Sequence, residues 1–465
     1  MIARRDMFGR KIITSDALEI TDENVIYELN QALAIHAFNR GQIDYLWRYY
    51  RGEQPILERT KDVRPEICNK IVENRANEIV SFKVGYLCGE PIQYVGRTSG
   101  EIVSKGISEL NEMMLNESKS AQDKEIVEWQ MICGTAFRLV LPRESSDMDE
   151  SPFQLFTLDP RDTFVAYSTD IDKHPLFAVK YRYTQANGYE YSVYSAYRYW
   201  LIINNEIAYS KNHGLGCIPI FEYPENNARL GSFEIVLPLL DSINNIDSNR
   251  MDAMEQTVQA FIKFVNCDIT SEDFIALKSL GAIKVKSVDG APADVDVVKN
   301  DLDQNQSQVT KEDCYEAVLT ICGMPNRNGG SSTSDTGAAV QLRDGWSQAE
   351  ARAKDSEVMF KRSERNVLRL ILRIIRDTQG LSNDIYQLKL RDIAMQFTRR
   401  NYENIQSKSQ VLTTMLQNDK IHPRLAFEHC GMFSDAEDAY KISADYYNSL
   451  QEHITTDDTV VKGIK

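Results

Sequence analysis

The stretch GMPNRNGGSSTSDTG occupies residues 323–337, and KRSERNVLRLILRIIR follows at residues 361–376, within a helical pattern that runs from about 335 to 377. The first stretch is rich in Gly, Ser and Asn, which supply no packing, and it therefore predicts a flexible loop. The second stretch places apolar residues at helical spacing and predicts one long amphipathic helix. Its apolar stripe consists of Val367, Leu370, Ile371, Ile374 and Ile375.

The opposite side of this predicted helix is basic. It carries a single acid, Glu364, and the cations Lys361, Arg362, Arg365, Arg369, Arg373 and Arg376. Such a row can face solvent or pair with the acidic remainder of the chain, and it can equally bind a partner subunit or phosphates. The sequence leaves these alternatives open.

Two further helices lie upstream of the loop and bracket a small mixed segment. Apolar residues at helical spacing predict a helix over 233–260, and the same pattern returns over 307–321. Between them we expect a short helix over Glu272–Leu280 and strands over Ala282–Val288 and Asp294–Lys299. This segment has too few residues for an extensive core of its own.

The rest of the chain combines helices with a β-rich region. Helices are predicted over 20–50, 67–87 and 102–137. The hydrophobic period changes to two between 153 and 223, where Asn187-Gly188 marks a hairpin. A strand over 386–397 and a helical tail over 401–450 complete the pattern. Together these elements predict an α+β chain that is mainly helical, with roughly three domains at about 150 residues each.

The composition excludes several classes of protein. The chain has 465 residues, with 53 Lys and Arg against 68 Asp and Glu, and its net charge is −15. A protein this acidic does not clamp DNA by general neutralisation of phosphates. No secretory signal and no membrane-spanning stretch is expected, because no long apolar run is present. The 8 Cys are scattered without a CxxC pair, so we expect thiols rather than disulfides or a zinc site.

The familiar catalytic motifs are missing. The sequence lacks a P-loop, a GxGxxG turn, a GxSxG elbow and an HExxH helix, so no cofactor, metal site or catalytic residue is expected. One alternative stays open, because Asp294 and Asp296 alternate onto one face of a predicted strand and Lys299 follows. Two acids and a lysine can form a metal-dependent nuclease site, although a solvated strand face has the same composition.

Several longer stretches carry a family likeness. They are Arg64-Pro-Glu-Ile-Cys-Asn-Lys-Ile-Val-Glu-Asn74, Leu158-Asp-Pro-Arg-Asp-Thr-Phe-Val-Ala-Tyr167 and Ile393-Ala-Met-Gln-Phe-Thr-Arg-Arg-Asn401. In this order, the sequence resembles the portal (head–tail connector) proteins of tailed bacteriophages, in the branch typical of long-tailed phages of Gram-positive hosts. The resemblance covers nearly the whole chain.

The resemblance implies a non-enzymatic ring of about twelve subunits at one capsid vertex, through which double-stranded DNA passes during packaging and ejection. The implied partners are terminase, the major capsid and scaffold proteins and head-completion proteins, with no membrane contact. The implied location is the virion, and the host cytoplasm during assembly. A different structural virion component is the remaining alternative to the portal and the nuclease.

The resemblance also divides the chain into regions. These are an N-terminal arm (1–19), an α+β wing (20–235 and 338–400), two stem helices (236–260 and 306–323), a clip (261–305), a tunnel loop (324–337) and a helical crown with the C-terminal tail (401–465).

The same likeness assigns site residues. The tunnel loop would present Asn326, Arg327, Asn328, Ser331, Ser332 and Thr333 to the DNA channel. The clip would present Lys284, Lys286, Asp289, Asp294 and Asp296 to the packaging motor and adaptors. Residues 266–306 hold eight acids and four lysines, a net charge of −4, and an acidic channel limits adhesion of the DNA backbone.

Overall fold

A computed structural model describes residues 9–97, 100–144, 150–258, 304–326, 345–399, 405–433 and 439–449, together with 261–265, 267–268, 272, 286–287, 292, 294–298 and 436. Its elements form a mixed α+β fold, which confirms the predicted class. The chain divides into two compact units. The first comprises Met1–Trp47, Asn77–Ile235 and Gly323–Lys465, and the second comprises Arg48–Ala76 and Val236–Cys322. In the described part of the chain, we find no helix with the length and apolar character needed to cross a bilayer.

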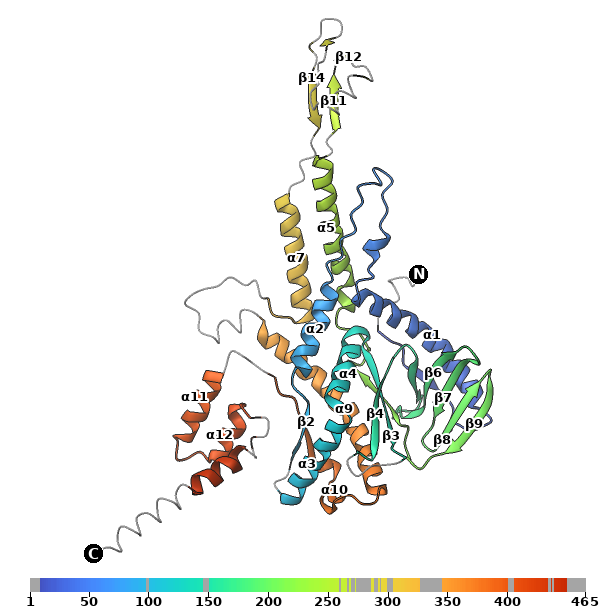
Figure 1. Ribbon diagram of the computed structural model, residues 1–465, viewed down its shortest axis with the longest axis vertical. Helices are drawn as coiled ribbons and strands as arrows, with labels where there is room; N and C mark the ends of the chain where they lie inside the picture. Colours follow the sequence, from blue (N-terminus) through green and yellow to red (C-terminus); the bar gives the residue numbers. More distant parts are fainter. Residues whose placement is uncertain are drawn as a thin grey trace, which may run out of the picture. The chain divides into compact units, whose positions relative to one another are not determined.

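The first unit contains a six-stranded sheet in the order β1-β5-β6-β7-β8-β9 (Figure 1). β1 runs parallel to β5, and the other neighbours are antiparallel. The β6–β7 connection falls at the predicted Asn187-Gly188 hairpin, where Gly188 adopts a φ of 70° that suits glycine. The strands are β1 (Ile13–Ser15), β5 (Thr163–Ser168), β6 (Pro175–Thr184), β7 (Gly188–Tyr194), β8 (Arg198–Ile203) and β9 (Glu206–Asn212).

One face of this sheet packs against α1 (Val25–Tyr50), which confirms the helix predicted over 20–50. Val25, Leu29 and Ala32 recur at helical spacing and share a core with alternate strand residues such as Val179 and Trp200. The buried Trp200 also donates from Nε1 to Asp22 Oδ1 (2.6 Å). This bond ties the start of the helix to β8, the neighbour of the edge strand β9.

The other face of the six-stranded sheet packs against a second sheet, in the order β10-β3-β4. Its strands are β10 (Ile220–Pro224), β3 (Thr135–Pro142) and β4 (Phe153–Leu158). Phe137 of β3 faces the first sheet, and side chains alternate along a strand, so Arg138 points the opposite way. On that side α4 (Lys119–Cys133) and α9 (Trp346–Asp377) contact the second sheet. The layers thus run from α1 through two sheets to α4 and α9.

Smaller elements of the first unit include α3 (Glu101–Asn116) and an antiparallel pairing of β2 (Gln93–Gly96) with β15 (Ile393–Gln396). The helix predicted over 102–137 is divided, because Ser118 has a φ of 53° between α3 and α4, and β3 begins at Thr135. In the tail, the described helices are α11 (Ile405–Leu416) and α12 (Pro423–Cys430).

The strand predicted over 386–397 is wrong for its first part. α10 (Asn383–Gln387) and the 3-10 turn η4 (Leu390–Asp392) precede β15, so only 393–396 is a strand. Ser382 caps α10, since its Oγ accepts from the Ile385 backbone N–H (3.3 Å). The cap satisfies an amide at the start of the helix, and the alternation of apolar residues that predicted a strand gives no sign of this hydrogen bond.

The second unit is built on two helices that lie side by side, α5 (Leu237–Val258) and α7 (Gln304–Cys322) (Figure 1). Both were predicted. Arg250 donates to Gln308 Oε1 (2.7 Å), and Lys311 Nζ lies 2.9 Å from Asp247 Oδ2. The short turns η2 (Pro55–Glu58) and η3 (Glu234–Val236) lie elsewhere along the chain.

Between α5 and α7 in sequence, the described residues form two short strand pairings. β11 (Phe261–Val265) pairs with β14 (Asp294–Val298), and β12 (Cys267–Asp268) pairs with β13 (Lys286–Ser287), all antiparallel. The strand predicted from Asp294 is confirmed over 294–298. The helix predicted over Glu272–Leu280 lies outside the described residues apart from Glu272.

Residues 67–74 form no helix, which corrects the prediction of one helix over 67–87; α2 covers only Arg75–Cys88. We call residues 59–74 the strap. Its backbone N–H groups donate to three side chains of α5, in the pairs Asn69 to Asp252 Oδ1 (2.7 Å), Ile71 to Ser248 Oγ (3.0 Å) and Glu73 to Asn244 Oδ1 (2.8 Å).

The strap and α5 match in spacing. Four residues of an α-helix rise about 6.0 Å, and two residues of an extended chain span about 6.6 Å, so every second strap amide meets every fourth helix residue. The buried Asp252 also pairs with Arg59 (3.1 Å) and Lys61 of the strap. These bonds replace the amide partners that a helix over 67–74 would supply, and the segment therefore forms no helix.

Candidate functional site

α9 is the element on which the sequence placed both a core stripe and a basic row. The core stripe is confirmed, because the residues Val367, Leu370, Ile371, Ile374 and Ile375 are each at most 4% exposed. Through this side α9 contacts all three strands of the β10-β3-β4 sheet.

A buried group of charges and tyrosines lies beneath α9. Glu364 is fully buried and accepts hydrogen bonds from Tyr94 Oη (2.6 Å), Arg138 Nη1 (3.0 Å) and Tyr223 Oη. Arg138 Nη2 donates to Asp123 Oδ1 (2.6 Å), and Lys119 Nζ lies 3.3 Å from Glu364 Oε1. We call this set the buried charge cluster; its members are Tyr94, Lys119, Asp123, Arg138, Tyr223 and Glu364.

The cluster keeps Glu364 ionised in spite of its burial. Burial raises the pKa of this carboxyl, but Lys119 and Arg138, followed by the Tyr223 and Tyr94 hydroxyls, outweigh it and lower the pKa to about 2. Burial and the Glu364 charge together raise the pKa of Tyr94, so its hydroxyl stays a donor. Two cations and two anions balance one another, and the cluster fixes α9 to α4 and the second sheet.

The basic row points away from this cluster. Arg362, Arg365, Arg369 and Arg373 are exposed, whereas Glu364, the one acid that the sequence grouped with them, faces the interior. Arg369 donates to Asn366 Oδ1 (2.8 Å), Arg373 to the Leu215 carbonyl, and Arg376 to the Leu388 carbonyl (3.1 Å). Within the described residues, no arginine of this row pairs with a carboxylate. We call Arg362, Arg365, Arg369, Arg373 and Arg376 the arginine row.

A groove of about 790 Å³ adjoins the start of the arginine row. Arg362 and Asn366 of α9 line it, and so do Asp172 and His174 from the loop between β5 and β6. Most of its apolar lining comes from Ile12, Val165, Ile171, Pro175, Ile220 and Phe221. The groove thus joins an apolar surface to the cationic side of α9.

Two aliphatic side chains, Ile171 of the groove lining and Leu18, are almost completely exposed. Ile171 is 104% exposed and Leu18 is 92% exposed. Their loops are joined where Thr169 Oγ1 donates to Asp16 Oδ1 (2.8 Å). An exposed aliphatic residue such as Ile171 that continues the apolar lining of a groove is consistent with an interaction surface.

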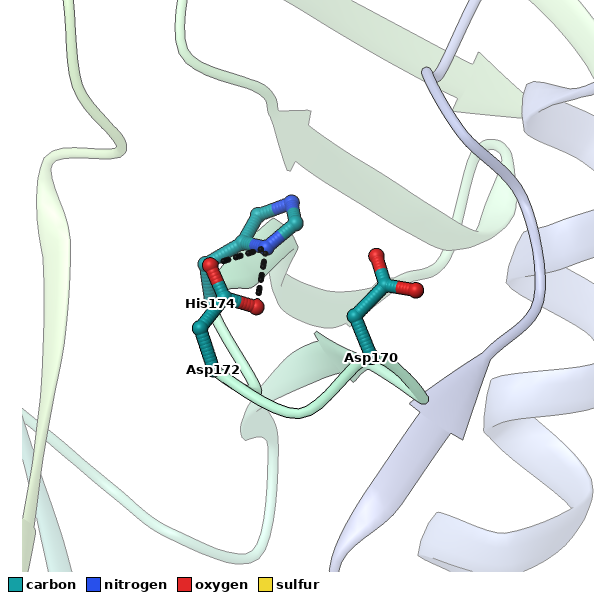
Figure 2. A group of neighbouring side chains, drawn as sticks. All are labelled: Asp170, Asp172 and His174. Carbon is teal, nitrogen blue, oxygen red and sulfur yellow. Dashed lines mark hydrogen bonds and ion pairs between the residues drawn. The ribbon is translucent and has the colours of Figure 1, made fainter.

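The loop between β5 and β6 also brings together three groups that could hold a metal ion (Figure 2). Asp172 and His174 face one another, with 3.0 Å between Asp172 Oδ1 and His174 Nδ1, and Asp170 lies beside them. All three are exposed, and Asp170 already accepts from Ser168 Oγ (2.7 Å). The sequence had pointed to no metal site in this loop, and exposed acidic groups of this kind are common without an ion.

The other predicted site residues are only partly described. Asn326 is half-buried at the edge of the predicted tunnel loop, and Arg327, Asn328, Ser331, Ser332 and Thr333 lie outside the described residues. In the predicted clip, Asp294 is exposed on β14, and Asp296 is in register with Lys263 of β11. Lys286 lies on β13, while Lys284 and Asp289 are outside the described residues.

The comparison with protein families then decides the relationship. The family model described as "Phage portal protein, SPP1 Gp6-like" matches residues 29–449. The chain belongs to the phage portal protein family. The match spans α1, both helices of the second unit, α9 and the helices of the tail.

Solved structures similar to this portal-family chain come from gene transfer agent particles. One, titled "Virion of native gene transfer agent (GTA) particle", is 8% identical, with a TM-score of 0.46, and the match covers 84% of this chain and 93% of the other. Another, titled "Neck of empty GTA particle computed with C6 symmetry", is 8% identical, with a TM-score of 0.45 and coverage of 77% and 90%. No curated protein matches the sequence.

The sequence patterns of this portal-family chain did not predict the buried charge cluster. Arg138 interrupts the apolar run Thr135–Pro142, and Glu364 occupies a position four residues after the buried Phe360 and three before the buried Val367. Those positions on an apolar face were the available signal, because a charge there has to find a buried partner. Which charges would meet depended on the contact between residues more than 200 positions apart.

Proposed function

We propose that this portal-family chain forms a closed ring of about twelve copies at one capsid vertex, and that double-stranded DNA passes through the ring during packaging and ejection. The observation that carries this proposal is the family match over residues 29–449. The ring is also the docking platform for terminase and for head-completion and tail proteins. The protein acts in the virion and assembles in the host cytoplasm.

The regions keep the roles that the resemblance implied. Residues 20–235 and 338–400 form the wing, 236–260 and 306–323 the stem, 261–305 the clip, 324–337 the tunnel loop and 401–465 the crown with the tail. The strap supports one addition, because its bonds to α5 make residues 59–74 part of the same compact unit as the stem helices.

The charge distribution supports a conduit rather than a clamp. Residues 266–306 carry a net charge of −4 within a chain of net charge −15. Negative walls repel the DNA backbone, and a few polar side chains on the tunnel loop, such as Asn326, Arg327 and Asn328, give contacts weak enough for sliding.

The first test is the mass and shape of the purified native protein, by light scattering and negative-stain electron microscopy. Twelve copies of a 53.1 kDa chain give about 637 kDa. A closed ring near that mass with a central hole wide enough for duplex DNA supports the portal. A closed particle without such a channel supports a different structural virion component instead.

A second test separates the portal from the nuclease alternative. Asp294 and Asp296 both lie on β14, two residues apart, which is the arrangement that a metal-dependent site would use. We expect no cleavage of linear duplex DNA by the wild-type chain with Mg²⁺, even at micromolar protein. Cleavage that disappears in Asp296→Ala would establish the nuclease and refute the non-enzymatic proposal.

A third test addresses the tunnel loop. Deletion of residues 328–335 is expected to leave rings intact and to impair packaging or retention of DNA, because a connecting loop contributes little to the fold. If the deletion prevents ring formation, the assignment of this segment to the channel is wrong.

A further inference from the structure

The arginine row lacks an anionic partner in the described chain. Its five guanidinium groups extend over about 21 Å of helix, since 14 residues separate Arg362 from Arg376. The described part of the chain supplies amide and carbonyl oxygens to this row but no carboxylate. The sequence has 68 acidic residues, so carboxylates are plentiful. The arginine row lacks a carboxylate partner among the described residues because of how the chain folds, not because of its composition.

The surface next to the row favours a protein partner. Arg362 and Asn366 line the groove together with apolar residues, and the exposed Ile171 lies on its lining loop. Protein interfaces combine an apolar centre with enriched arginine, whereas DNA-binding surfaces are much more uniformly polar and positive. The arginine row therefore borders an apolar groove, and this combination is typical of a protein–protein interface.

The strength of phosphate binding gives an independent argument. Five arginines in each of about twelve copies could neutralise roughly 60 phosphates, and each neutralised phosphate steepens the dependence of binding on salt. A row of that size along the DNA path would hold the duplex, which conflicts with a conduit. This step rests on the proposed function.

We propose that the arginine row and the adjoining groove form an interface with a second copy of this chain, whose carboxylates pair with the guanidinium groups. Arginine is suited to this role because its planar fork binds a carboxylate through two parallel hydrogen bonds. Copies with a net charge of −15 repel one another, so a basic row that meets an acidic surface supplies attraction and fixes orientation. A basic surface that meets a different, acidic surface makes a heterologous contact, the kind that closes a ring.

The test reverses two charges in the middle of the row. In the double variant Arg365→Glu with Arg369→Glu, both side chains are exposed, so we expect native circular dichroism and an unchanged melting temperature. The matched control is Lys124→Glu with Lys211→Glu, two exposed lysines of α4 and β9 whose reversal changes the net charge equally. Mass photometry across a protein dilution series at 0.15 M salt measures assembly.

We expect the arginine variant to need roughly tenfold more protein for half-assembly, and the lysine control to stay within about twofold of wild type. Wild-type assembly should also weaken as salt rises from 0.1 M to 1 M, because the Debye length falls from about 10 Å to about 3 Å. A third variant, Ile171→Asp, should weaken assembly as well if the groove is buried between copies, since this side chain is fully exposed in the single chain.

Binding of a 30-base-pair duplex, measured by fluorescence anisotropy, supplies the opposing outcome. If the arginine variant assembles like wild type but loses duplex binding, nucleic acid occupies the row and the proposal is overturned. Equal weakening by the arginine variant and the lysine control also overturns it, because the effect would then be one of net charge. A wild-type chain that never assembles refutes the ring itself, whereas unimpaired assembly of all variants refutes only this interface.

Discussion

The buried charge cluster gives a sharp quantitative prediction. Replacing Glu364 by Gln keeps the size of the side chain and removes the anion that Arg138 and Lys119 face at 3.0 and 3.3 Å. The fall in the pKa of Glu364 from 4.5 to about 2 corresponds to roughly 3–4 kcal/mol, since one pKa unit is about 1.4 kcal/mol. Removing one member of a buried ion pair typically costs about 3–5 kcal/mol, so the two routes agree.

The assay is urea unfolding followed by tryptophan fluorescence at several pH values. At pH 7 we expect Glu364→Gln to lower the free energy of unfolding by about 3 kcal/mol. The folded pKa lies below the unfolded one, so this contribution is complete above about pH 4.5 and is lost as pH falls toward 2. The difference between the wild-type and variant curves should therefore shrink as pH falls from 4.5 to 2, and less than half of it should remain at pH 3.

The control for this experiment is Asp355→Asn, an exposed carboxylate on the same helix, for which we expect a change within about 0.5 kcal/mol. A difference below about 1 kcal/mol at pH 7 for Glu364→Gln would refute the argument that the cluster holds α9. A large difference that stays constant down to pH 3 would refute the electrostatic explanation and would leave packing as the cause.

Three further predictions follow from single contacts. Ser248→Ala removes the acceptor of the Ile71 amide, so hydrogen exchange at that amide should accelerate about tenfold. The Glu73 amide, which donates to Asn244, should keep its rate; equal acceleration at both amides would contradict independent hydrogen bonds along the strap. Burial raises the pKa of Glu225 to about 7, and its Oε2 is buried with no hydrogen-bond partner among the described residues. Glu225→Gln should therefore gain about 3 kcal/mol of stability over wild type as pH rises from 4.5 to 8, and an advantage independent of pH would show that the charge is not the cause. Gly134 has a φ of 78°, and an added Cβ would lie 2.1 Å from the Arg229 carbonyl oxygen. Gly134→Ala should therefore lower the free energy of unfolding in urea by at least about 3 kcal/mol. Gly188→Ala, where φ is 70° but no atom lies near the added Cβ, should cost about 1 kcal/mol, and equal costs would refute the steric argument.

Periodicity and turn chemistry correctly predicted the elements that depend on nearby residues or that pack on one face only. The stripe on α9 recurs at helical spacing and faces one sheet, and the Asn187-Gly188 turn needs only its own backbone geometry. The basic row was also visible, because exposed residues that share a helix face share a spacing in sequence. The family likeness over most of the chain was supported by the match over 29–449.

The prediction over 67–87 went wrong where local pattern and tertiary contact disagreed. Ile71 fits a helical stripe with Ala76 and Ile79, but the amides of residues 71 and 73 find their acceptors on α5, more than 170 residues away. Propensity favours a helix only when no other partner satisfies the backbone better. No pattern within the segment reveals a partner so distant.

The sequence by itself determined the class of fold, the family and the separation of apolar from basic residues along α9, because composition and spacing are properties of the chain. The tertiary structure alone decided that Glu364 turns inward to Arg138, that the strap lies on α5 and that the arginine row borders an apolar groove. These features depend on which distant groups satisfy one another's charge and hydrogen bonds, and that choice is made only when the layers pack.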